Sequence, residues 1–202
     1  MATATAAQVK ELRDKTGAGM MDCKAALEEA GGDLDKAVDL LRKKGLAQAA
    51  KRAWRVAKDG MIGHYIHMGG KVGVLVEVNC ETDFVARTPD FQTLAKEIAM
   101  HIAAASPLVV KREDLPAGTL EKEKEIYRAQ FAGQNKPANV IDKIVEGKLE
   151  SYYSQVCLMD QPSVRDPNVT IKQMVAAATA KTGENVTITR FVRFKLGETA
   201  EL

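Results

Sequence analysis

Two kinds of residue in this sequence could do chemistry of their own. Cys80 is a candidate thiol nucleophile, but no motif of a thiol enzyme surrounds it and the chain has only three histidines. A buried thiol at the end of a strand is the alternative interpretation. His64 and His67 fall in an expected strand, where side chains alternate between faces, so they cannot hold a metal ion together. No CxxC pair is present, and no metal site is expected.

A phosphate-binding loop is the next candidate. Such a loop needs a glycine five positions before the glycine of Gly-Lys and a serine or threonine after the lysine. Here Gly70 and Lys71 are followed by Val72, and Tyr65 stands where the first glycine belongs. The chain is therefore not expected to bind a nucleotide or a cofactor itself, and nothing in the sequence indicates an enzyme.

The most informative stretch is EVNCETDFVAR at residues 77–87. Thr82, Asp83, Phe84 and Val85 are predicted to form a strand-to-helix loop, and such loops often carry function. A phenylalanine beside a carboxylate is an awkward pairing on a loop, because the ring gains from burial while the carboxylate resists it. Two interpretations remain: Phe84 enters a partner's pocket, or it folds back onto its own core.

A second candidate contact surface is the turn GAGMM at residues 17–21. Gly17 and Gly19 permit a tight turn, and Met20 and Met21 carry flexible thioether side chains that adapt to an apolar partner. The alternative is that one of the two methionines fills the core of its own module.

Residues 42–58 form a basic run without an acidic residue. Its cations are Arg42, Lys43, Lys44, Lys51, Arg52, Arg55 and Lys58. The run predicts either a solvated helix face or an RNA contact. The net charge of +2 favours the solvated face.

Composition indicates an ordinary globular protein. The 202 residues are 46% hydrophobic, which suffices for a real core. Cys23, Cys80 and Cys157 show no paired short spacing, so a reducing compartment without disulfides is expected. No apolar run approaches the roughly 20 residues that span a bilayer, and no targeting segment is recognisable. We therefore expect a cytoplasmic protein with no membrane contact.

The N-terminal part predicts a three-helix module over residues 1–45. Thr5 and Gln8 form a capping-box pattern for the first helix, and Gly17 can end it. Asp33 can cap the third helix, which Gly45 is expected to close. An alanine-rich linker helix over residues 46–60 then carries the only tryptophan, Trp54.

Residues 61–202 predict an α+β core domain in which helices cover a small antiparallel sheet. Residues 61–67 and 72–78 have the pattern of a β-hairpin turning at two glycines. Thr88 and Pro89 begin a helix with one apolar stripe, formed by Phe91, Leu94, Ala95, Ile98, Ala99 and Ile102.

The rest of this domain contains a helical insertion, a capped helix and a final strand. The insertion is expected around residues 119–160, with its second helix interrupted at Gly147. Thr170 and Gln173 repeat the capping-box pattern, and Gly183 ends that helix. The last strand is predicted to pair with the hairpin and to keep one face apolar through Val186, Ile188, Val192, Phe194 and Leu196.

Two stretches resemble the signature motifs of the bacterial elongation factor Ts family. They are LRDKTGAGMMDCKAAL at residues 12–27 and EVNCETDFVAR at residues 77–87. Their order, spacing and flanking elements also resemble the family over essentially the whole chain, and the length is similar to the family's short form. Longer members carry a second core subdomain and a coiled-coil insertion, so contacts made by those parts are not carried over.

The resemblance implies a guanine-nucleotide exchange factor for elongation factor Tu, which acts in translation elongation without making or breaking bonds. It also implies that the N-terminal module is similar to a ubiquitin-associated three-helix bundle. Positions of the first motif that abut the partner's nucleotide domain are matched by Arg13, Met20, Met21 and Lys24. The segment credited with dislodging the partner's magnesium ion is matched by Thr82, Asp83, Phe84 and Val85. Short-form members further imply a homodimer, expected here through the C-terminal sheet region.

Overall fold

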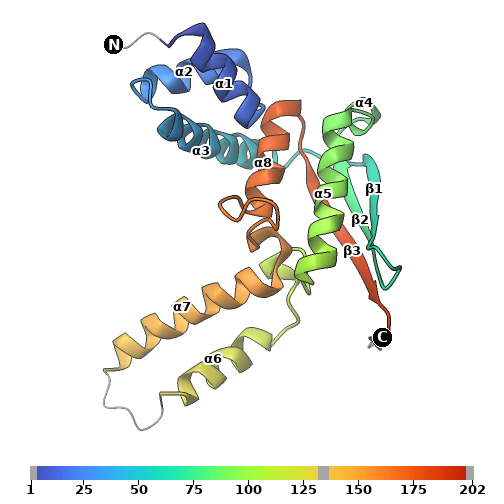
Figure 1. Cartoon of the computed structure of the whole chain (residues 1–202). Coiled ribbons are helices and arrows are strands. Elements are labelled where there is room, and N and C mark those ends of the chain that lie inside the picture. The colour runs from blue at the N-terminus through green and yellow to red at the C-terminus, as the bar shows by residue number, and fades with distance from the viewer. Residues whose placement is uncertain (1–3, 132–136, 199–202) are drawn as a thin grey trace.

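A computed structural model describes residues 4–131 and 137–198. Three helices form a module at the N-terminus, and a three-stranded antiparallel sheet covered by helices forms the core, as Figure 1 shows. The predicted α+β class is confirmed. The ubiquitin-associated-like classification of the module stays a prediction.

The N-terminal module contains α1 (Ala6–Thr16), α2 (Met20–Glu29) and the first half of α3 (Leu34–Arg52). The capping box of Thr5 and Gln8 is formed, Gly17 ends α1 in the left-handed conformation, and the Asp33 carboxylate caps α3. These local signals were predicted correctly. The helices share one small apolar core, made of Val9, Leu12, Cys23, Ala26, Leu27 and Ala37.

Helix α3 does not end at Gly45, so the expectation of a separate linker helix over residues 46–60 is wrong. The helix continues to Arg52 because Gly45 is buried where α3 packs against α8 (Ile171–Thr182). A Cβ atom at residue 45 would lie 3.9 Å from the carbonyl oxygen of Ala176 and 4.0 Å from the Cβ of Ala180. These are ordinary contact distances, so the packing of α3 against α8 carries the helix past Gly45 and outweighs the tendency of glycine to stop a helix.

The sheet has the strand order β1 (Asp59–Ile66), β2 (Val72–Cys80), β3 (Thr187–Lys195). The predicted hairpin of β1 and β2 is confirmed, and Val74, Val76 and Val78 are buried on the inner face. Helix α5 (Pro89–Ala105) covers that face, and every residue of its predicted apolar stripe is buried. Gly63 allows this contact, since a Cβ atom there would lie 2.8 Å from the carbonyl oxygen of Ala95.

The single apolar phase predicted for the last strand is wrong beyond Ile188. Glu77 pairs with Arg190 while Val78 pairs with Ile188, so Thr189 is an extra residue in β3. Such a bulge reverses the faces of the residues that follow it. Phe191 consequently packs against the core, and Val192 and Phe194 lie exposed on the outer face with Ile62 and Leu75.

The helical insertion is an antiparallel pair, α6 (Thr119–Ala129) and α7 (Ala138–Val156), that projects away from the sheet in Figure 1. Two short 3₁₀ turns at Arg112–Asp114 and Leu158–Asp160 flank it. Gly147 does not interrupt α7, contrary to expectation. The helical insertion predicted around residues 119–160 is otherwise confirmed. No helix in the described ranges is long and apolar enough to cross a membrane.

Candidate functional site: an apolar contact surface at one end of the molecule

Residues 82–85, predicted as a loop, instead begin a one-turn helix, α4 (Asp83–Ala86). It directly follows β2 and precedes α5, and Figure 1 shows it at the end of the molecule where α8 and α5 meet the sheet. Thr82 stands at the N-cap, but its hydroxyl makes no capping hydrogen bond. That hydroxyl instead donates a hydrogen bond to Glu184.

The turn α4 separates its two apolar side chains. Val85 packs against the core and Ala86 is buried, whereas the Phe84 side chain is 79% exposed. Of the two interpretations left open by the sequence, folding back onto the chain's own core is therefore excluded. Phenylalanine is among the residues enriched in protein–protein interfaces.

Asp83 and Arg87 form an ion pair across α4, with 2.7 Å between Oδ2 and Nη2. The pair lies one helical turn apart, and its aspartate sits in the first turn, where a negative charge is favoured. The carboxylate is consequently held beside its own helix and stabilises the turn that carries Phe84.

The first turn of α2 presents Met20 and Met21, which are 49% and 76% exposed. The alternative that one of them fills the module's core is excluded, because Cys23 and Leu27 occupy that core instead. Arg13 and Lys24 are exposed as well, and Lys24 lies 3.9 Å from Glu28 in a weak ion pair.

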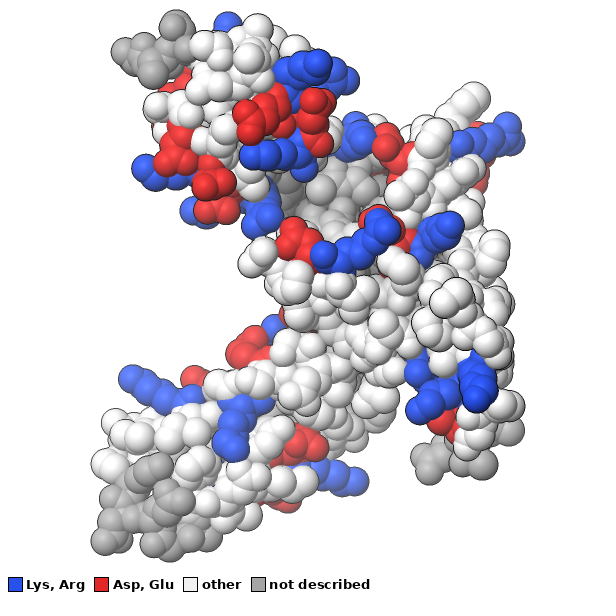
Figure 2. Space-filling model, in the orientation of Figure 1, with Lys and Arg blue, Asp and Glu red and all other residues white. Residues whose placement is uncertain are grey.

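Lys181, near the end of α8, lies between the two predicted surfaces. Its Nζ is 2.8 Å from the carboxylate of Asp90 at the start of α5, and its side chain is next to Gly17 in the α1–α2 turn. The turn before α2 and the start of α5, the helix that follows α4, thus share one neighbouring side chain. The surface is hollowed between the module and the core, with charged side chains along the rim in Figure 2, and a cavity of about 250 Å³ lies there.

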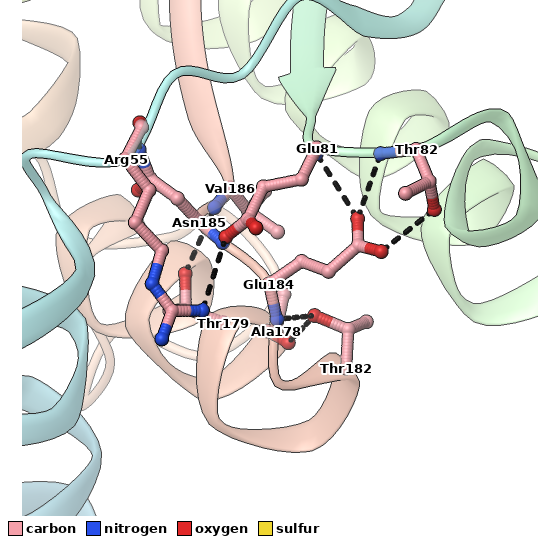
Figure 3. A network of polar contacts seen from close by, with 9 residues as sticks. All are labelled: Arg55, Glu81, Thr82, Ala178, Thr179, Thr182, Glu184, Asn185 and Val186. Atoms are coloured by element: carbon pink, nitrogen blue, oxygen red, sulfur yellow. Dashed lines mark hydrogen bonds and ion pairs between the residues drawn. The ribbon is translucent and has the colours of Figure 1, made fainter.

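Two carboxylates join the approach to α4 to the turn between α8 and β3 (Figure 3). One oxygen of Glu184 accepts hydrogen bonds from the backbone N–H groups of Glu81 and Thr82, both at 3.0 Å. Its other oxygen accepts the Thr82 hydroxyl at 2.6 Å. In return, the Glu81 carboxylate accepts the backbone N–H of Asn185 at 2.7 Å.

The segment that leaves α3 reaches the same place. The side-chain amide of Asn185 donates to the carbonyl oxygen of Arg55 at 2.7 Å, and the Arg55 guanidinium lies 3.5 Å from Glu81. We call the five residues Arg55, Glu81, Thr82, Glu184 and Asn185 the Glu81–Glu184 clamp. Sequence reasoning missed Glu184 and Asn185 because their partners lie about a hundred positions away, and no local signal marks them.

The basic run of residues 42–58 is partly neutralised. Lys44 pairs with Asp22, Arg55 pairs with Glu81, and Arg42 donates to the carbonyl oxygen of Asn168. Charges engaged in this way are poorly placed to track a phosphate backbone, which counts against RNA contact. Just beyond α3, Trp54 is 79% exposed.

Cys80 is a buried thiol at the end of β2, which confirms the alternative to a thiol nucleophile. Its Sγ donates to the carbonyl oxygen of Thr82 at 3.1 Å. Burial, reinforced by the nearby Glu184 carboxylate, raises the pKa of Cys80 from 9.0 to about 11. The thiol is therefore protonated at neutral pH and is a poor nucleophile. The described ranges contain no cluster of three or more potential metal-ligating His, Cys, Asp or Glu side chains.

The fold and these surfaces define an α+β protein that presents exposed apolar side chains at one end. Comparison with known sequences supplies the particular family. The profile described as Elongation factor TS matches residues 6–198. Elongation factor Ts of Fervidobacterium nodosum is 61% identical over 96% of this chain and 98% of its own length. That of Carboxydothermus hydrogenoformans is 58% identical over 96% of this chain and 89% of its own.

The chain belongs to the elongation factor Ts family. It is thereby a translation elongation factor of the nucleotide-exchange class, and the family implies elongation factor Tu as the partner. The resemblance found in residues 12–27 and 77–87 is confirmed.

Proposed function

We propose that this chain releases GDP from elongation factor Tu by inserting Phe84 beside the partner's magnesium site while Met20 and Met21 hold the partner's nucleotide domain. The observation that carries the proposal is the exposed ring of Phe84 on a helix fixed to the end of a sheet. A GTPase holds its magnesium ion and phosphates through mutually supporting contacts, so a displaced element near the ion weakens the whole set.

The energy available from Phe84 sets a limit on what it does alone. Burying a phenylalanine is worth about 1.5 to 3 kcal/mol, which corresponds to roughly ten- to a hundred-and-fifty-fold weaker nucleotide binding. A larger effect requires further contacts. The paired methionines supply an adaptable apolar surface, and Arg13 and Lys24 lie exposed on the same module.

Asp83 acts in this proposal by orienting α4. Its ion pair with Arg87 already holds the carboxylate against its own helix, so direct repulsion of the nucleotide's phosphates is not required. By linkage, nucleotide and exchange factor weaken each other's equilibrium binding to the partner by the same factor.

The test measures release of fluorescent GDP from elongation factor Tu at increasing concentrations of the chain. Phe84→Ala is expected to slow release at saturation by at least about tenfold. The double variant Met20→Ala plus Met21→Ala is expected to raise the half-saturating concentration, because it removes contact area.

Leu108→Ala is the matched control, since it removes another exposed apolar side chain near the far end of α5 from α4. It should release GDP at the wild-type rate. Wild-type release by Phe84→Ala or by the methionine variant would refute the role assigned to that surface. Steeply salt-dependent RNA affinity that is lost when the basic run is neutralised would instead favour the RNA-binding alternative.

The same proposal includes association of two copies through the outer face of the sheet. That face carries exposed apolar side chains on all three strands, among them Ile62, Leu75, Val192 and Phe194. An apolar sheet face in water favours burial against a like surface, and a two-fold contact lets the same residues serve on both sides. A dimer would then present two copies of the Phe84 surface.

A further inference from the structure

We infer that Glu184 is a positioning residue for nucleotide exchange, because its carboxylate fixes the short helix that carries Phe84. The inference rests on the proposed function and adds to it a residue outside both signature stretches. Glu184 need not touch the partner; it acts through Thr82 and the backbone at residues 81 and 82.

A single helical turn has little stability of its own, since nucleating a helix is unfavourable. Helix α4 spans only four residues, and Thr82 does not cap it. Its orientation must therefore come from contacts with the core. Val85 and Ala86 provide apolar contacts on one side, and Glu184 provides three hydrogen bonds at the N-terminal end.

The Glu184 side chain is itself well supported. It follows Gly183, the left-handed C-cap of α8, and its backbone N–H donates to the hydroxyl of Thr182 at 3.3 Å. That hydroxyl donates in turn to the carbonyl oxygen of Ala178, and Val186 N–H donates to Thr179 (Figure 3). The anchor of α4 is consequently a turn fastened to the end of α8.

The clamp also reaches the segment that follows α3. Asn185 bonds to Glu81 on one side and to the carbonyl oxygen of Arg55 on the other. Arg55 belongs to the segment that leaves α3, the helix shared by the N-terminal module and the core. The clamp thus fixes the segment that follows α3 and the approach to α4 to one turn of the chain.

Two substitutions at residue 184 distinguish the effect of side-chain length from the effect of side-chain charge. Glutamine keeps the reach: its carbonyl oxygen can accept both backbone N–H groups, and its amide can donate to the rotatable Thr82 hydroxyl. Aspartate keeps the charge but is one methylene too short. A positioning role therefore predicts an active Glu184→Gln and a defective Glu184→Asp, whereas a charge acting on the nucleotide predicts the reverse.

The first readout needs no partner. Amide hydrogen exchange at residues 82–87 should be faster in Glu184→Ala and Glu184→Asp than in the wild type and Glu184→Gln, while exchange in β2 stays unchanged. The matched control is Glu97→Ala, which removes the ion pair with Arg165 halfway along α5. Unchanged exchange at residues 82–87 in Glu184→Ala would overturn the inference.

The second readout is release of fluorescent GDP from elongation factor Tu. Glu184→Ala should lower the maximal rate by about tenfold, as expected for losing hydrogen bonds to a charged group, with little change in half-saturation because the methionine surface is intact. A wild-type maximal rate in Glu184→Ala, or an aspartate variant faster than the glutamine variant, would contradict the inference. Failure of the proposed function gives a different result, since the wild-type chain would then not accelerate release at all.

Discussion

Phe84 and Val85 are adjacent in the chain, yet α4 sends the first side chain into solvent and the second into the core. A loop and a one-turn helix would each send one of two adjacent apolar side chains to solvent and the other to the core. The sequence of a four-residue segment therefore cannot tell which of the two is exposed. The motif predicted an exposed position for one apolar side chain of this segment, and its contact with a partner stays a prediction. The orientation of these side chains depends on Glu184, which no local pattern connects with them.

Cys80 provides a prediction that also rests on one side chain. Burial raises its pKa to about 11, so the folded chain keeps a proton that the unfolded chain loses near pH 9. The free energy of unfolding should therefore fall as the pH rises from about 9 to about 11. Below pH 9 this contribution is fully present.

Urea unfolding between pH 8 and pH 11 measures this decline, with Cys80→Ala, which has no thiol to titrate, as the comparison. Iodoacetamide labelling followed by peptide mapping tests the burial that causes it. At neutral pH, Cys80 in the folded chain should react far more slowly than in urea. Rapid labelling of the native chain at pH 7 would show that the thiol is accessible and ionised, and would revive the thiol-enzyme alternative.

Among the elements, α3 has an N-terminal end that neighbouring residues predict and a C-terminal end that they do not. Caps at Thr5, Asp33, Thr88 and Thr170 were predicted correctly because each involves neighbours three or fewer residues away. The helix ends predicted at Gly45 and Gly147 were wrong, and so was the apolar phase beyond Thr189. At Gly45 and Thr189 the deciding contacts come from α8 and from the sheet register, whereas a Cβ atom at residue 147 would meet nothing within 4 Å and the glycine is tolerated inside α7.

Gly45 offers a test of the α3–α8 crossing. Gly45→Ala should leave stability unchanged or raise it by up to about 1 kcal/mol, because the added Cβ meets only ordinary contacts of 3.9 and 4.0 Å. Gly45→Leu should destabilise by about 1 to 3 kcal/mol through overpacking. Urea unfolding monitored by circular dichroism distinguishes the two, and equal stability of the two variants would mean that the helices do not meet closely at this residue.

A pH effect is expected where α5 meets the segment after Leu158–Asp160. His101 is buried, accepts the N–H of Val164 at Nδ1 and donates from Nε2 to Gln161 at 2.8 Å. Burial lowers its pKa below 6.5. The unfolded chain then binds a proton before the folded chain does, so the unfolding free energy should fall as the pH drops below about 6.5.

Thermal unfolding between pH 5 and pH 8 would measure this effect. His101→Gln, which cannot titrate, should show a flatter decline at the acidic end than the wild type. Identical declines in both proteins would exclude His101 as the source.

At the scale of the whole molecule, the bulge at Thr189 places Val192 and Phe194 on the exposed apolar face of the sheet. If two copies associate there, Phe194→Asp should shift the chain to a monomer, because the 64% exposed ring would be replaced by a charge that resists burial. Sedimentation at several concentrations provides the measurement. Val164→Asp, at an exposed apolar position outside the sheet, is the control, and a monomeric wild type would refute the dimer.

The general architecture of module, sheet and helical pair followed from periodicity and capping patterns. Their junction did not, because α3 serves both the module and the core and the Glu81–Glu184 clamp joins residues 55, 81 and 184. Long-range pairing of this kind leaves no period in the sequence.

The exposed side chain of Trp54 stands next to Arg55, where the module meets the core, and it is the only indole in the chain. Its emission therefore reports on this junction without an attached dye. A partner that excludes water there should shift the spectrum to shorter wavelength, while acrylamide should quench the free chain freely.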